Sequence, residues 1–313
     1  KQMMLSVPEP LLGVVAQELL AGTIGSCAGM IVGQPLDTVK VLLQTRGALY
    51  SGVFDCFAQT LRWGGIRSLW TGLVPPLIAN APLSAILFGS YEHMLRILET
   101  NYPNRSVSNE ISLTNMSVAG AWAGGVRAFV LTPVDLIKCR LQSAQSAERS
   151  HLGNRGSLSC ARDIFLSRGV GGFFVGLWAT FYRDSISYGF YFLTYESVKR
   201  KFTRRRQDDH DAVDYPHSTP SIPVRLFAGS LAGIAVWATT YPFDCIKSVI
   251  QTLPNDSNPK HRRIYHCVQM MYRKNGFRSF WIGFTPAIAR SIPVNAVCLC
   301  VYEQLVTSFR QNR

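Results

Sequence analysis

Three copies of one short pattern place an acidic and a basic residue three positions apart. The copies begin at Pro35, Pro133 and Pro242, and each reads proline, any residue, aspartate, two residues, lysine. On a helix, residues three apart share a face, so the charges of each copy lie together. A charge pair snorkelling at a membrane edge would explain one copy but not three. We predict that each aspartate meets the lysine of a neighbouring copy, which closes an ionic gate of six residues: Asp37, Lys40, Asp135, Lys138, Asp244 and Lys247.

A glutamine follows each lysine by four positions, at Gln44, Gln142 and Gln251. Four positions correspond to about one helical turn, so each amide lies further along the same face. We predict that these glutamines brace the closed ion pairs.

A second group of polar residues lies within apolar stretches and breaks the threefold pattern. Its members are Asn80, Arg183, Asp184 and Arg290. A charge at membrane depth is costly and usually marks a substrate pathway. Arginine offers paired donors to a carboxylate, and aspartate accepts an amine. We predict a binding site for a solute that carries both signs of charge; the alternative is that Arg183 and Asp184 only neutralise each other.

Arg127 is a candidate accessory contact, because Gly29 and Val236 occupy the corresponding positions of the other two copies. Aromatic residues near the predicted site could add cation–π contacts or could simply pack the wall. They are Tyr182, Tyr188 and Tyr191.

The composition indicates that membrane-spanning helices position these residues. Charged residues make up 16% of the 313-residue chain and apolar residues 47%, whereas soluble domains carry about a quarter of their residues as charge. Six apolar stretches are long enough to cross about 30 Å of hydrocarbon as helices. They span residues 11–36, 73–91, 113–134, 177–195, 222–243 and 284–302.

The net charge of +13 is scattered through the loops without a nucleic-acid-binding motif, which favours anionic lipid and argues against nucleic acid as a partner. No Ser/His/Asp set, metal cluster or glycine-rich phosphate loop favours an enzyme or a metal site.

Further features repeat with the proline motif and define the fold class. An aromatic residue two places before glycine recurs at Gly72, Gly176 and Gly283, and a cysteine recurs within an amphipathic stretch of each copy, at residues 53–62, 158–167 and 265–274. We predict an all-α membrane protein with six transmembrane helices in three pseudo-symmetric repeats and three short amphipathic helices. The predicted repeats cover residues 11–100, 110–202 and 220–310, with a polar linker at 203–219.

Small residues recur four apart before each proline, which permits close helix packing and could also let one end of a cavity shut. The pairs are Gly22 and Ser26, Gly120 and Gly124, and Gly229 and Gly233.

The chain resembles the mitochondrial carrier family, whose signature is this proline, acid and base motif followed by glutamine and an aromatic-containing glycine motif, repeated three times. The resemblance covers residues 11–308. It implies six tilted helices around a water-filled cavity, three short helices on the matrix side, and transport by alternating access across the mitochondrial inner membrane. It also implies that the six gate residues form the matrix-side network.

The family has a second network on the cytoplasmic side, written as aromatic, acid, two residues, base. Glu196 and Lys199 fit it fully, whereas Glu92 and Glu303 are followed by Leu95 and Val306 at the basic positions. We therefore expect an incomplete cytoplasmic gate.

The resemblance also implies bound cardiolipin, because family members hold lipid phosphate at helix starts marked by glycine. Helix N-termini bind anions through unpaired N–H groups. The corresponding glycines are Gly52, Gly72, Gly156, Gly176 and Gly283. We expect structural cardiolipin, no other cofactor and a monomeric protein.

The Arg183–Asp184 pair, together with residues 81–83, looks most like the carnitine/acylcarnitine branch of the family. Ornithine-type carriers usually have glutamate where Leu83 stands. We expect a carrier of carnitine and acylcarnitine or of a basic amino acid. The alternatives are an exchanger of ornithine, lysine or arginine, or a membrane scaffold that kept the fold without transport.

Overall fold

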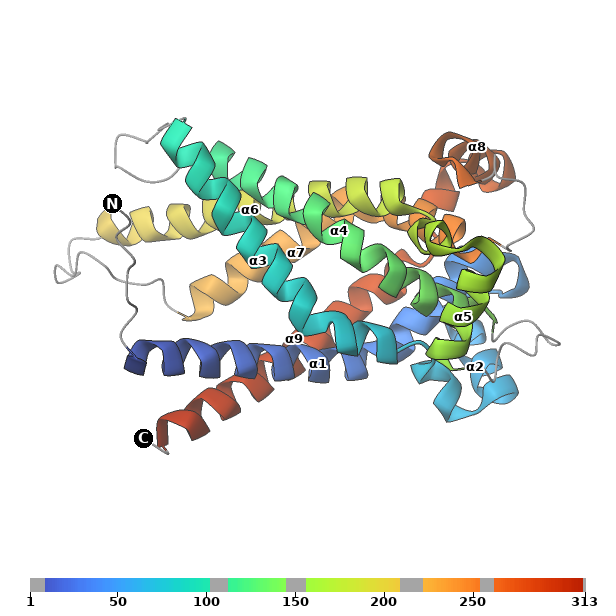
Figure 1. Ribbon diagram of the computed structural model, residues 1–313, viewed down its shortest axis with the longest axis horizontal. Helices are drawn as coiled ribbons and strands as arrows, with labels where there is room; N and C mark the ends of the chain where they lie inside the picture. The colour runs from blue at the N-terminus through green and yellow to red at the C-terminus, as the bar shows by residue number, and fades with distance from the viewer. Residues whose placement is uncertain (1–8, 102–111, 145–155, 209–221, 254–261, 312–313) are drawn as a thin grey trace. The chain divides into compact units, whose positions relative to one another are not determined.

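Figure 1 shows the computed structural model, which describes residues 9–101, 112–144, 156–208, 222–253 and 262–311. Within these ranges the regular structure is helical. The six long helices are α1 (Glu9–Arg46), α3 (Val74–Asn101), α4 (Leu113–Ala144), α6 (Leu177–Asp208), α7 (Ile222–Thr252) and α9 (Phe284–Gln311). The three short ones are α2 (Val53–Gly64), α5 (Ser157–Arg168) and α8 (Ile264–Asn275).

The order long, short, long occurs three times along the chain, as the repeated motifs predict. The short helices coincide with the amphipathic stretches to within two residues at each end. α6 continues to Asp208, into the segment predicted as a polar linker, because the arginines and the glutamine at 204–207 are good helix formers. Residues 209–219 of that segment lie outside the described residues.

The long helices differ in how apolar they are. Among the described residues, three segments are long and apolar enough to cross a membrane: Gln17–Leu49, Ile66–Asn101 and Ile264–Phe309. The bent pair Ser157–Arg168 and Val170–Val198 would make a fourth. In α4, Arg127 and several glycines lower the mean hydropathy.

The helices group into two compact units. The first comprises residues 1–81, 141–157 and 283–313, and the second comprises residues 82–140 and 158–282. In the first unit α1 packs against α9; these are the dark blue and red helices that cross in Figure 1. In the second unit α6 packs along α7.

Glycines allow close helix approach in both units. A Cβ atom at Gly25 would lie 2.8 Å from the Cys298 carbonyl oxygen on α9, and one at Gly124 would lie 2.4 Å from the Asp184 carbonyl oxygen on α6. The predicted pair Gly120 and Gly124 therefore packs closely against α6. In the first copy the close contact falls at Gly25 instead of Gly22, whose Cβ would meet nothing within 4 Å.

The three repeated cysteines are buried packing residues of the short helices. Cys56 in α2 and Cys267 in α8 are fully buried, each with its sulfur 4.0 Å from a carbonyl oxygen of the preceding long helix. Burial raises the pKa of the Cys56 thiol to about 12, so this thiol stays protonated at neutral pH.

Two glycine turns recur in every repeat and connect the short helix to the next long one. All six glycines have positive φ, between 60° and 82°, which other residues adopt only with strain. The first set is Gly65, Gly169 and Gly276, and the second is Gly72, Gly176 and Gly283. The positive φ of the second turn thus explains why the aromatic-containing motif has glycine in all three repeats.

We expect Gly65→Ala to lower the free energy of unfolding by about 1–3 kcal/mol, because φ of 66° with ψ of −174° is nearly restricted to glycine. Gly52→Ala is the matched control, since Gly52 has an extended φ of 170° and a Cβ meets nothing within 4 Å at either position. Thermal unfolding of the purified variants in detergent measures the difference. Equal melting temperatures for the two variants would contradict the assignment of strain to this turn.

Candidate functional site

Charged side chains from three helices of the second unit form one buried cluster, which we call the α4–α6–α7 cluster. Its members are Arg127 and Asp135 on α4, Arg183 and Asp184 on α6, and Asp244 and Lys247 on α7. Three positive side chains pair with three negative ones. Such pairing is what makes charge tolerable in a membrane-spanning segment.

Asp184 has both carboxylate oxygens paired, and the residue is only 2% exposed. Arg183 Nε donates to its Oδ1 at 2.7 Å, and Arg127 Nη1 donates to its Oδ2 at 3.0 Å. The predicted solute contacts Arg183, Asp184 and Arg127 are therefore brought together, in part by their own mutual ion pairs.

Arg183 also reaches two aspartates of the predicted gate. Its Nη1 donates to Asp244 Oδ1 at 3.1 Å, and its Nη2 lies 3.9 Å from Asp135 Oδ2. Lys247 donates to the same oxygen of Asp135. The Lys247–Asp135 pair joins the lysine of the third repeat to the aspartate of the second, which is one of the three contacts that the gate hypothesis requires.

A related arrangement occurs in the first unit, where Arg290 on α9 donates to Asp37 on α1. Here too an arginine predicted to contact solute holds an aspartate predicted to form the gate. The sequence, which gives only spacing along single helices, predicts the gate aspartates and the solute-contact arginines as two separate layers. Packing of one helix against another brings the layers into contact, because an arginine side chain spans about one helical turn. Lys40 and Lys138 lie one turn after their aspartates, on α1 and α4.

The predicted glutamine braces occupy separate buried environments. Gln142 Nε2 donates to the Thr38 hydroxyl at 3.0 Å, and Thr38 in turn donates to the Leu69 carbonyl at 2.8 Å. Gln251 is fully buried beside Gly176, and Gln44 is buried near the end of α1. The bracing role stays a prediction.

Asn80 ties α3 to α1 in the first unit. Its Nδ2 donates to the Ser26 hydroxyl at 2.5 Å and lies 3.3 Å from the Thr23 carbonyl oxygen. The Asn80 side-chain amide, which the sequence predicts to contact solute, therefore donates to α1. Its acceptor, Ser26, belongs to the predicted pair of small residues Gly22 and Ser26.

The aromatic candidates fall into different environments. Arg127 lies over the Tyr188 ring, 5.5 Å from its centroid, so Tyr188 makes a cation–π contact with the protein's own guanidinium. Tyr191 stacks on Tyr195, whereas Tyr182 is half exposed beside Trp178. Tyr182 fits the wall-packing alternative.

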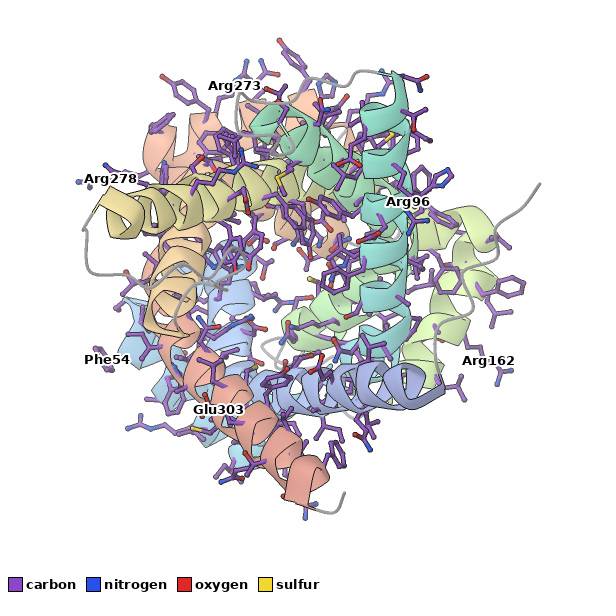
Figure 2. The ribbon with its side chains drawn as sticks, turned by 90° about the vertical axis from the view of Figure 1, so that its left-hand side faces the viewer. Phe54, Arg96, Arg162, Arg273, Arg278 and Glu303 are labelled. Atoms are coloured by element: carbon purple, nitrogen blue, oxygen red, sulfur yellow. The ribbon has the colours of Figure 1, made fainter. Side chains whose placement is uncertain are left out.

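Two of the three acidic residues predicted for the cytoplasmic gate, Glu196 and Glu92, pair within their own helices. Arg200 donates to Glu196 at 3.0 Å, and Arg96 donates to Glu92 at 3.4 Å. Sequence reasoning missed both arginines because it looked three positions after the acid, although the four-residue Glu–Arg spacing typical of helical pairs was present. Glu303 is exposed on α9 (Figure 2), and the Lys199 side chain lies outside the described residues.

The glycines predicted to bind lipid lie at helix starts, where backbone N–H groups lack helical partners. Gly52 and Gly156 directly precede α2 and α5, Gly176 and Gly283 precede α6 and α9, and Gly72 lies two residues before α3. At the start of α2, Asp55 accepts a hydrogen bond from the Ser51 N–H, which lowers the pKa of its carboxyl group.

Three repeats of paired long helices, with balanced charge buried inside them, define a multi-pass membrane transport protein. The chain matches the mitochondrial carrier protein family over residues 13–102, 109–206 and 218–313. It therefore belongs to the mitochondrial carrier family, whose members are transporters of the mitochondrial inner membrane and not enzymes.

Named relatives align over nearly the whole chain. Identity is 35% over 299 residues to solute carrier family 25 member 45 of Mus musculus, covering 94% of this chain and 99% of the relative. It is 35% over 295 residues to the mitochondrial carnitine/acylcarnitine carrier protein of Mus musculus, covering 92% of each. It is 34% over 285 residues to the mitochondrial basic amino acids transporter of Bos taurus, covering 90% of this chain and 88% of the relative.

We expect Lys247→Met to lower the free energy of unfolding by about 3 kcal/mol, because it leaves Asp135 without its closest cation in a buried site. Asp135→Asn in the same background should recover part of the loss. The control is Arg96→Met, which removes an arginine that is 79% exposed and should change stability by less than about 1 kcal/mol. Denaturation in detergent measures all three, and equal losses for Lys247→Met and Arg96→Met would contradict the buried pairing.

Proposed function

We propose that the protein moves a carboxylated amine, either carnitine and its acyl esters or a basic amino acid, across the mitochondrial inner membrane by alternating access. The observation that carries the proposal is the buried Arg183–Asp184 pair on α6, which presents both signs of charge within one span. The carnitine/acylcarnitine and basic amino acid relatives support it, since both transport solutes with a carboxylate and a cationic nitrogen.

The proposed mechanism is an exchange of ion-pair partners. A solute carboxylate offers Arg183 an alternative to Asp244, to which it donates at 3.1 Å. In the first unit, Arg290 donates to Asp37 and can exchange partners in the same way. An arginine taken by solute leaves its gate aspartate with one partner fewer. Solute binding therefore weakens the closed arrangement of the gate and favours the change of access, because a ligand shifts an equilibrium only through differential contacts.

Two solute classes fit the proposed site: carnitine with its acyl esters, and basic amino acids. Leu83 is buried on α3 where ornithine-type carriers usually have glutamate, which favours a carnitine-type solute. A basic amino acid exchanger is the second candidate, supported by the 34% identity to the transporter of that name. A scaffold without transport is disfavoured by the buried α4–α6–α7 cluster, because charge in a span is retained at a cost.

We also propose that the protein functions as a monomer with structural cardiolipin at the helix starts. The exposed side chains next to the short helices fit an anionic bilayer surface: Phe54 on α2, Arg273 on α8 and Arg278 just after α8 lie outside the ribbon in Figure 2. Basic side chains attract anionic headgroups, and aromatic ones lie at the membrane interface.

Reconstituted protein should take up carnitine or at least one of lysine, arginine and ornithine, and should not take up nucleotides. The physical reason is that a nucleotide carries several negative charges and offers Asp184 no cationic group. Uptake of labelled solutes into proteoliposomes, with and without each candidate loaded inside, measures both the substrate and the need for exchange. Nucleotide uptake without any of the amines would refute the substrate class.

Arg290→Ala should reduce uptake of the transported solute at least tenfold while the protein remains folded, because it removes a forked donor from the predicted site. Arg290→Lys should retain part of the activity, since it keeps the charge without the fork. Melting temperatures establish folding, and Arg162→Ala, at an exposed position on α5, controls for loss of an arginine. Wild-type uptake by Arg290→Ala would remove this residue from the site.

A further inference from the structure

Arg127 stands out within the α4–α6–α7 cluster because it has no counterpart in the other repeats. Gly29 and Val236 hold the corresponding positions. One turn before Arg127, Gly124 brings α4 so close to α6 that a Cβ would lie 2.4 Å from the Asp184 carbonyl oxygen. The local packing thus positions a cation of α4 directly against the carboxylate of α6.

The Arg127 guanidinium occupies the place on Asp184 that a solute ammonium would need. Arg127 Nη1 is 3.0 Å from Asp184 Oδ2, and Arg183 covers the other oxygen. The side chain of Asp184 is 3% exposed and that of Arg127 is 20% exposed. Tyr188 lies against the Arg127 guanidinium and further fixes it.

The pair therefore sets conditions on any solute that binds Asp184. A solute with only a cation would displace Arg127 and leave its guanidinium buried without a partner, which is costly. A solute with only a carboxylate could bind Arg127, but Asp184 would then lose the cation that Arg127 provides and gain none in return. A solute that carries both groups inserts into the pair, since its ammonium replaces Arg127 on Asp184 and its carboxylate takes the released guanidinium.

We propose that Arg127 is a specificity-determining residue that admits zwitterionic solutes and rejects cations lacking a carboxylate. The inference rests on the proposed function, in which Asp184 receives the cationic group of the solute. It assigns the selectivity to one side chain of α4, whereas the other charged residues of the predicted solute site lie on α6 and α9.

The test compares solutes that differ by a carboxylate: lysine with cadaverine, and carnitine with choline. Wild-type protein in proteoliposomes should take up the better zwitterion at least tenfold faster than its carboxylate-free partner. Arg127→Gln frees Asp184 and should raise the ratio of cadaverine to lysine uptake, or of choline to carnitine uptake, at least tenfold, equivalent to about 1.4 kcal/mol of selectivity. Arg127→Lys keeps the charge and should retain the wild-type ratio, as should the control Arg162→Gln, which changes an exposed arginine on α5.

A ratio within one variant is informative because a purely structural loss would lower both uptakes together. If Arg127→Gln fails to fold, the double variant Arg127→Gln/Asp184→Asn removes both charges and leaves neither uncompensated; its two uptakes should lie within about threefold of each other. An unchanged ratio in Arg127→Gln, or in the double variant, overturns the inference while wild-type zwitterion uptake still supports the proposed function. Absence of any zwitterion uptake by the wild type overturns both.

Discussion

Charge inside a membrane-spanning helix must be compensated by charge of the opposite sign, and this constraint organises the protein's interior. Arg183 is the central compensating residue of the second unit, because its guanidinium contacts aspartates on α4, α6 and α7. Removing an ion from water costs several kcal/mol even after relaxation, so each carboxylate requires a cation from a neighbouring helix. The same constraint makes the cluster responsive to solute, since an incoming charged group can replace one of the existing partners.

The threefold repeat supplies a scaffold on which asymmetric chemistry is placed. The glycine turns and the buried cysteines recur in equivalent positions, and they serve chain geometry and packing. The residues that break the repeat are Asn80, Arg127, Arg183, Asp184 and Arg290; Arg183 and Arg290 hold equivalent positions of the second and third repeats, where the first has Ala79. An asymmetric solute needs asymmetric contacts, whereas a gate can be symmetric. For this reason we assign the repeated residues to the fold and the gate, and the unrepeated residues to solute binding.

Much of the fold could be predicted from the sequence because local signals determine it. The amphipathic periodicity around Cys56, Cys160 and Cys267 predicts the short helices almost to the residue, and the length of the apolar stretches predicts the long ones. The partners of the charged residues could not be predicted in the same way. That Arg290 meets Asp37, or that Asn80 donates to Ser26, depends on which helix faces which and at what distance, and spacing within one helix carries no such information. The Glu196–Arg200 pair has the four-residue spacing of helical ion pairs, whereas the family pattern predicts Lys199 as the base.

Thermal unfolding of the purified protein with a panel of solutes tests most directly whether balanced charge inside the spans is a zwitterion site. A ligand that binds the folded state raises the melting temperature according to its concentration and affinity. The account predicts a concentration-dependent rise with carnitine or with a basic amino acid, and none with nucleotides or with dicarboxylates. A rise with nucleotides or dicarboxylates, and none with any of the zwitterions, would contradict it.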